Sequence, residues 1–183
     1  MRRWLALAAA LLAMTACTRP PPARTTVQQY MENEVNPAAE FLFRSVRDVS
    51  DAGGARLEAP KSEAGWKEVR EQLAVLQAAP EVLGAKGLKA APAGFKSEHP
   101  GIESEPAWIQ TAIDSNRADF DRRAQRLRQA ADRAAQAAEA HDPRALQRAL
   151  DGVDKACESC HLHYFYPNDK RAWQAAKDDG VGD

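Results

Sequence analysis

The most reactive side chains of this sequence are concentrated in one short segment, Cys157-Glu158-Ser159-Cys160-His161. Two thiols three residues apart, followed directly by an imidazole, suit three kinds of chemistry. They can exchange a dithiol for a disulfide, contribute ligands to a metal site, or form covalent bonds to a cofactor. The only other cysteine among the 183 residues is Cys17. The secondary structure around the segment is therefore the evidence that distinguishes these possibilities.

The predicted surroundings disfavour the first two. A thioredoxin-type pair lies at the N-terminal end of a helix that follows a strand, where the helix dipole lowers the thiol pKa. Here the pair lies near the C-terminal end of a predicted helix with no strand before it. Zinc bound by the two cysteines, His161 and His163 is disfavoured because the two histidines point to different sides of a helix and structural zinc usually draws its ligands from separate segments. Two core cysteines and a histidine without further function remain an alternative.

Cys-x-x-Cys-His is the attachment signature of c-type haem, in which two thiols bind the porphyrin and the histidine binds iron. At about 100° per residue, the two cysteines, His161 and Tyr164 all face the side of the helix that carries Leu146. The segment therefore predicts one covalent haem c, attached to Cys157 and Cys160. His161 is the expected proximal iron ligand, and Tyr164 is expected to pack on the haem.

If the iron has a second axial ligand, it must come from upstream, because no methionine follows His161. Met31 is the only methionine outside the first sixteen residues. It lies on the apolar stripe of the first predicted helix, and periodicity alone favours a core side chain there, a common role for methionine.

The rest of the chain is predicted to be helical. Helices are expected over about 25–50, with a kink at Pro37, over 62–79, over 105–141, and from Asp142-Pro143 through the CESCH segment. Residues 84–104 are rich in glycine and proline and predict a loop. No segment alternates polar and apolar residues as a strand does. Four amphipathic helices predict an all-α fold, an antiparallel up-down-up-down four-helix bundle over residues 25–170 with the haem on its last helix, followed by a tail, 171–183.

Apolar residues recur at helical spacing and define the predicted buried stripes. The many charged residues of the third helix, from Arg117 to Arg128, are expected to form a solvated surface or a weak docking patch for a redox partner. The stripe of the first helix comprises Val27, Met31, Val35, Ala38, Leu42, Val46 and Val49, and that of the second comprises Trp66, Val69, Leu73 and Leu76.

The N-terminal residues predict export. Arg2 and Arg3 precede a short apolar run, and Met14-Thr15-Ala16-Cys17 resembles the lipobox of bacterial lipoproteins. Residues 1–16 are thus expected to be a signal peptide, with Cys17 lipidated. Residues 17–24 then form a Pro-rich linker that holds the domain away from a membrane. The expected location is the periplasm, with the anchor in the outer rather than the inner membrane, because Thr18 is not an aspartate.

A CxxCH segment on the last of four predicted helices resembles the cytochrome c′ family, the class II c-type cytochromes. The stretch YMENEVNPAAEFLF, residues 30–43, is similar to the first helix of exported members of its low-spin branch, and CESCHLHYFYP, residues 157–167, is similar to their C-terminal end. The resemblance implies haem c with His161 as proximal ligand and Met31 as distal ligand. One departure follows His161, where typical members carry a basic residue and this chain has Leu162, His163 and Tyr164.

The expected function is a c-type cytochrome that carries single electrons in the bacterial cell envelope, rather than an enzyme. Its expected partners are redox proteins of the envelope, the membrane through Cys17, and a second copy in a homodimer. A formal net charge of −1 without a basic face argues against nucleic acid. Two alternatives stay open: a five-coordinate haem protein that binds NO or CO, and a haem-free interaction lipoprotein of the envelope.

Overall fold

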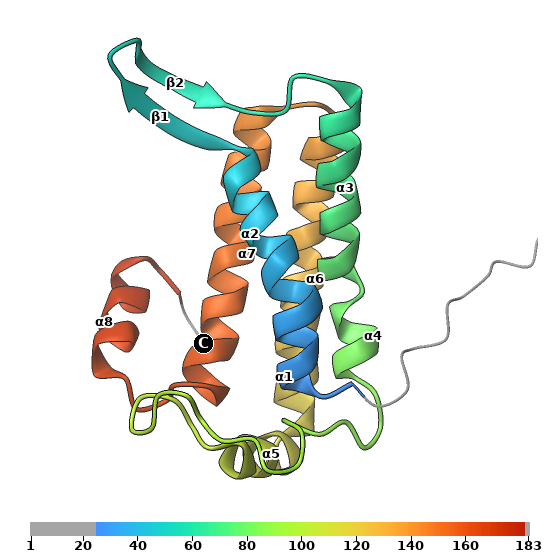
Figure 1. Ribbon diagram of the computed structural model, residues 1–183, viewed down its shortest axis with the longest axis vertical. Helices are drawn as coiled ribbons and strands as arrows, with labels where there is room; N and C mark the ends of the chain where they lie inside the picture. Colours follow the sequence, from blue (N-terminus) through green and yellow to red (C-terminus); the bar gives the residue numbers. More distant parts are fainter. Residues whose placement is uncertain (1–24, 182–183) are drawn as a thin grey trace, which may run out of the picture.

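The computed structural model describes residues 25–181. The predicted signal peptide, Cys17 and the linker lie outside the described residues, as do the last two residues. The described part of the chain is mostly helical, which confirms the expected helical class. In Figure 1 the first helical stretch (residues 27–45) lies along the long axis of the molecule, as do the helices α3 (Glu63–Gln77), α6 (Arg117–Glu139) and α7 (Pro143–Tyr164).

The first stretch is not one regular helix. It consists of α1 (Val27–Tyr30), a π-helical segment η1 (Met31–Val35) and α2 (Asn36–Ser45). Thr26 begins it with a capping box, in which the Gln29 N–H donates to Thr26 Oγ1 at 3.2 Å. In the π segment the Asn36 N–H donates to the Met31 carbonyl. Pro37 follows directly and has no N–H to donate, so a wider turn before it relieves its crowding of the previous turn. The irregularity expected at Pro37 is therefore found in the turn that precedes it.

A β-hairpin follows the first helical stretch, contrary to the expectation that the helix continues to residue 50 and that no strand is present. Strand β1 (Arg47–Asp51) pairs antiparallel with β2 (Gly54–Glu58). Both strands are mostly exposed, so no apolar alternation marks them in the sequence. Gly54 adopts φ 96°, which favours glycine in the tight turn. Arg47 stands opposite Glu58 across the hairpin and donates a hydrogen bond to it.

The second predicted helix is confirmed as α3 (Glu63–Gln77). Ser62 caps it by accepting a hydrogen bond from the Gly65 N–H at 3.2 Å. A short helix, α4 (Ala79–Leu83), continues from it with Pro80 in its first turn, and the region from 84 to 104 is a loop, as predicted. The four residues expected on the inner face of α3 are all buried: Trp66, Val69, Leu73 and Leu76.

The third predicted helix is in fact two helices, α5 (Pro106–Ser115) and α6 (Arg117–Glu139). The chain breaks at Asn116, whose backbone leaves the helical region at φ −142° and ψ 60°. Its side chain then caps α6 by accepting from the Asp119 N–H at 3.2 Å. Asparagine competes with helical hydrogen bonds through its own side chain, which makes a break followed by a new cap possible here.

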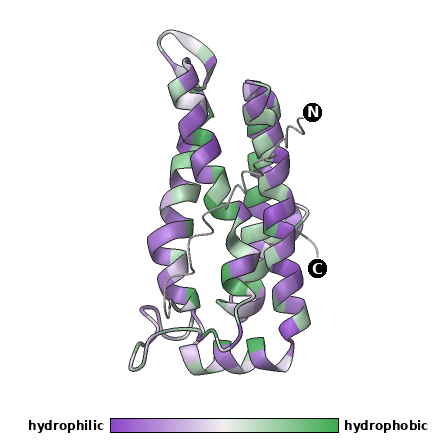
Figure 2. Ribbon diagram, turned by 90° about the vertical axis from the view of Figure 1, so that its right-hand side faces the viewer, coloured by the Kyte–Doolittle hydropathy of each residue, from purple (hydrophilic) through white to green (hydrophobic). Residues whose placement is uncertain are grey.

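The last elements are α7 (Pro143–Tyr164) and α8 (Lys170–Asp178). Residues 170–178, expected in part as a tail, form a helix capped by Asp169 and folded back beside α7 (Figure 1). The core lies between the long helices, and Figure 2 shows hydrophilic and hydrophobic residues alternating along them, as expected for helices with one buried face. Among residues 25–181, no helix is both long and apolar enough to cross a bilayer.

Candidate haem-attachment site

Helix α7 carries the CESCH segment in its last third and presents it to the core. Asp142 caps the helix by accepting from the Ala145 N–H at 2.9 Å, and Pro143 occupies the first turn, as predicted. Leu146, Leu150 and Val153 are buried on the same face. Hydrophobic packing therefore fixes the helix just before the two cysteines.

The two thiols of the segment are half-buried. Cys157 and Cys160 pack against the hydrophobic core, and neither is in a disulfide. Burial raises the pKa of both thiols to about 12, and neighbouring acidic residues contribute to this at Cys157. A redox dithiol requires a lowered thiol pKa. The environment is thus the opposite of a thioredoxin-type site.

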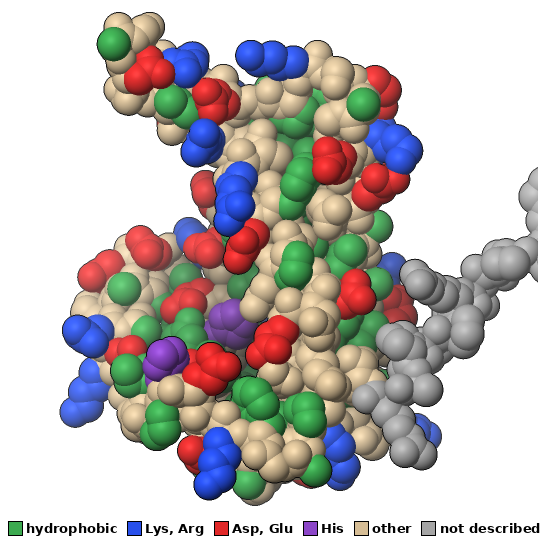
Figure 3. Space-filling model, in the orientation of Figure 1, with side chains coloured by type: hydrophobic (Ala, Val, Ile, Leu, Met, Phe, Trp, Pro, Cys, Tyr) green, Lys and Arg blue, Asp and Glu red, His purple; other side chains and the backbone are tan. Residues whose placement is uncertain are grey.

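His161 lies half-buried beside aromatic and acidic side chains. Its ring centroid is 6.1 Å from those of Phe165 and Tyr166. Burial lowers the pKa of His161, while the charges of Glu158 and Asp154 partly oppose this effect. A lowered pKa keeps the imidazole neutral at pH 7, the form that binds a metal. Figure 3 shows histidine, acidic and hydrophobic side chains close together where α8 lies beside α7.

The described residues do not support zinc at this place. Within residues 25–181 no group of three or more histidine, cysteine or acidic side chains is arranged to hold a metal ion. His163 points elsewhere, with its Nε2 3.7 Å from Asp119 on α6. Two free thiols and one neutral imidazole on a single helical face fit a group held by two covalent bonds and one axial bond, which is haem c.

The structure places Met31 in the π segment, half-buried against the same core cluster as Cys157 and Cys160. Gln28 lies three residues before it, on the same side of the helix. Its side-chain Oε1 is buried and is the one buried side-chain oxygen or nitrogen of the described chain without a hydrogen-bond partner. Iron binding by Met31 stays a prediction.

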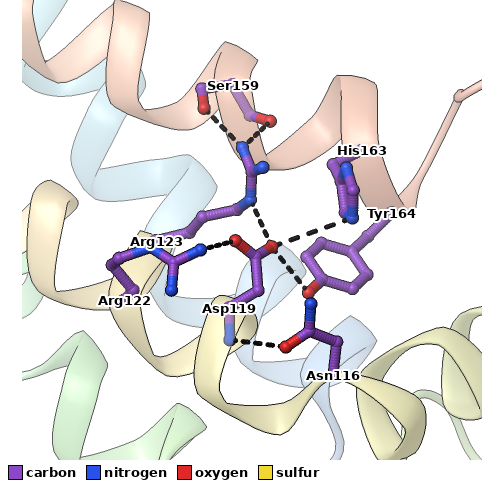
Figure 4. A network of polar contacts seen from close by, with 7 residues as sticks. All are labelled: Asn116, Asp119, Arg122, Arg123, Ser159, His163 and Tyr164. Atoms are coloured by element: carbon purple, nitrogen blue, oxygen red, sulfur yellow. Dashed lines mark hydrogen bonds and ion pairs between the residues drawn. The ribbon is translucent and has the colours of Figure 1, made fainter. Parts of the chain in front are cut away.

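A buried polar network lies beside the segment (Figure 4). The sequence predicts Asp119 and Arg123 on a solvated face of the third helix, yet each side chain is only 7% exposed. Arg123 Nε donates to Asp119 Oδ2 at 2.7 Å, and its Nη1 donates to Ser159 Oγ at 2.7 Å. Ser159, the partner of Arg123 on α7, is 36 residues away in the sequence, so no local pattern predicts this contact. The one signal in the sequence is that Asp119 and Arg123 are one helical turn apart, on either side of the apolar Phe120.

Tyr164, expected to pack on the haem, belongs to the same network. It is 4% exposed, and its hydroxyl donates to Asp119 Oδ2 at 3.1 Å. Its ring meets that of Phe120 edge to face, with centroids 5.2 Å apart. Burial and the hydrogen bond to Asp119 raise the pKa of Tyr164, so it remains a neutral donor. Contact between Tyr164 and haem stays a prediction.

A groove of about 470 Å³ lies elsewhere, between α2, β2 and α3, next to Phe41, Leu57 and Pro60. None of the predicted site residues lines it. We place the chemistry at α7 because the reactive side chains lie there.

Residues 74–164 match the family model described as Cytochrome C′. The match begins within α3, includes α6 and the CESCH segment, and ends with α7, so that α8 lies beyond it. Comparison with curated proteins and with solved structures gives no significant match.

Proposed function

We infer the function of this chain from its family: it belongs to the cytochrome c′ family, whose members bind haem c covalently. The family comprises haem proteins that carry electrons or bind gases, and it is not typically enzymatic. We propose that this member carries single electrons through one haem c. The observation that carries the proposal is the placement of Cys157, Cys160 and His161 together on the buried part of α7.

In this proposal each side chain of the segment has one task. Cys157 and Cys160 would hold the haem covalently through their sulfur atoms, and the imidazole of His161 would be a ligand of its iron. When bound, the haem would supply an iron that gains or loses one electron. The apolar packing of α7 excludes water, and the four long stretches are proposed to form the antiparallel bundle that encloses the group.

Met31 is the proposed distal ligand, and it decides between the two activities of the family. If Met31 binds the iron, its thioether would raise the reduction potential and would leave no ligand position for a gas. Support comes from its place in the irregular turn of the first helical stretch and from its packing on the core shared with the thiols. Irregular π turns occur frequently at functional sites.

One measurement tests this function. Purified protein, produced with a haem-attachment system, is studied by absorption in the oxidised and reduced states, before and after addition of CO. We expect low-spin haem with a methionine–iron charge-transfer band and no change with CO. Met31→Ala should give high-spin haem that binds CO, whereas Met31→Leu serves as a control that keeps the apolar volume without a strong ligand. High-spin wild-type haem that binds CO readily would support gas binding instead, and protein without covalent haem would refute both activities.

We further propose that the protein works in the periplasm, anchored by a lipid on Cys17, with redox proteins of the envelope as its partners. The Met14–Cys17 sequence and the Pro-rich residues that follow support this. Cys17→Ser should move the protein from the membrane fraction to the soluble periplasmic fraction without changing its haem spectrum. An unchanged distribution between the fractions would contradict the anchor.

A further inference from the structure

One arginine of α6 reaches the middle of the haem-attachment segment. Arg123 Nη1 donates to the Ser159 carbonyl at 2.9 Å and to its hydroxyl at 2.7 Å (Figure 4). Ser159 lies between the two cysteines and is itself buried. The contact therefore holds both the backbone and the side chain of the segment from the neighbouring helix.

The remainder of the interface between α6 and α7 has few features that define an orientation. The buried face of α6 beyond Leu127 consists of small residues: Ala130, Ala131, Ala134, Ala137 and Ala138. Alanines allow close approach, but their shallow surface opposes rotation or sliding of α7 less than large interlocking side chains do. Hydrogen bonds are directional, so a guanidinium that binds two atoms of Ser159 fixes the rotation of α7 about its axis and its position along that axis.

Asp119 holds the arginine in this position. It accepts from Arg123 Nε at 2.7 Å and from Tyr164 at 3.1 Å, and Arg122 donates to its other oxygen. A buried ion pair contributes little net stability compared with apolar packing. A pair that is well satisfied on all sides can instead select one arrangement among several of similar energy.

We propose that Arg123, oriented by Asp119, is a positioning residue for haem attachment. By holding Ser159 it sets the direction in which Cys157, Cys160 and His161 project from α7. This inference rests on the proposed function, because it assigns that segment to haem. Arg123 acts through the backbone of the segment and does not itself bind iron.

The test compares holo-protein of the wild type with Arg123→Gln, Arg123→Lys and a matched control, Arg117→Gln. Arg117 lies on the same helix, pairs with Asp121 at 2.8 Å and also donates to a backbone carbonyl, that of Leu83, but it forms no hydrogen bond or ion pair with α7. Thioether bonds per chain are counted by mass spectrometry of the denatured protein. The ligand environment of ferric iron is followed by electron paramagnetic resonance.

We expect one ferric species with two thioether bonds in the wild type and in Arg117→Gln. In Arg123→Gln the ratio of this species to other species should fall by about tenfold to a hundredfold, the effect of losing hydrogen bonds from a charged donor. Arg123→Lys should restore part of it, because one charged donor remains. Ser159→Ala, a milder change, should shift the ratio in the same direction if Arg123→Gln does not fold.

Two outcomes overturn the proposal. Identical spectra and thioether counts in Arg123→Gln and Arg117→Gln would show that the contact has no effect on the haem. A stability loss in Arg123→Gln with an unchanged single species would make the arginine purely structural. Failure of the wild type itself to carry haem would refute the proposed function rather than the role of Arg123.

Discussion

Replacing Asp119 by asparagine should lower the free energy of unfolding far more than the same replacement in an exposed ion pair of α6. The substitution keeps the shape of the side chain but removes the charge that faces Arg123, and both side chains are 7% exposed. Leaving one partner of a buried pair without its counter-charge costs about 3–5 kcal/mol. At about 2–4 °C of Tm per kcal/mol for a chain of this size, Asp119→Asn should lower Tm by roughly 6–20 °C.

Urea unfolding of fully haem-loaded protein at pH 7, followed by circular dichroism, measures the loss in the free energy of unfolding. Thermal unfolding followed in the same way measures the change in Tm. Asp121→Asn is the matched control, because Asp121 lies two residues away and pairs with Arg117 while its side chain is 47% exposed. An exposed pair is worth at most about 1 kcal/mol. Equal losses in the two variants would refute our account of a buried, charge-dependent network.

The stabilisation that Asp119 provides should also depend on pH. Burial alone would raise the pKa of Asp119, but the hydrogen bond and charge of Arg123, assisted by Tyr164 and His163, outweigh this and lower it. The stabilisation is therefore complete above the ordinary carboxyl pKa of about 4 and is lost as pH falls through the lower folded value. The difference in unfolding free energy between wild type and Asp119→Asn should shrink as pH falls below ~4. A difference that grows as pH falls below ~4 would contradict this sign.

Three further predictions concern other parts of the molecule. Leu146→Ala, at a position with no exposed surface, should cost about 2–5 kcal/mol in urea unfolding, and a loss under about 1 kcal/mol would show that the core closes around the cavity. His141 has φ 51°, and its ring stacks on that of Trp66 with the ring centroids 5.1 Å apart. His141→Gly should relieve the backbone strain but lose the stacking, with little net change in the free energy of unfolding. His141→Ala keeps the strain without the stacking and should be less stable than the glycine variant by about 1 kcal/mol. Replacing residues 47–58 by a short flexible turn should leave the haem spectrum unchanged, because the hairpin is mostly exposed.

Periodicity predicted those parts of the fold in which one helical face is buried without interruption. The inner residues of α3, such as Trp66 and Leu73, follow the expected stripe, and Ser62 and Asp142 mark two helix starts correctly. Apolar spacing and capping chemistry are local properties, so they can be read from a single sequence. The CESCH segment was equally accessible, because its chemistry depends on spacing within five residues.

Features that depend on distant partners or on exposed backbone were missed. The break at Asn116 interrupts a run that is otherwise favourable for a helix, and the hairpin has no buried face to produce an alternating pattern. Asp119 and Arg123 look like ordinary surface charges until Ser159 is placed beside them. Burial of charge follows from tertiary packing, which residue types along one helix do not specify.

The π segment has a consequence for insertions and deletions in the first helical stretch. The hydrogen bond from the Asn36 N–H to the Met31 carbonyl encloses one residue more than an α-helical turn does. Deleting the exposed Asn33 should therefore convert the segment into regular helix while Tyr30 and Ala38 keep facing the core. The same deletion in α3, for example of Glu68, should turn half of its apolar face by about 100° toward water. One residue of the first stretch is thus geometrically surplus to the helix, and it lies in the turn that presents Met31.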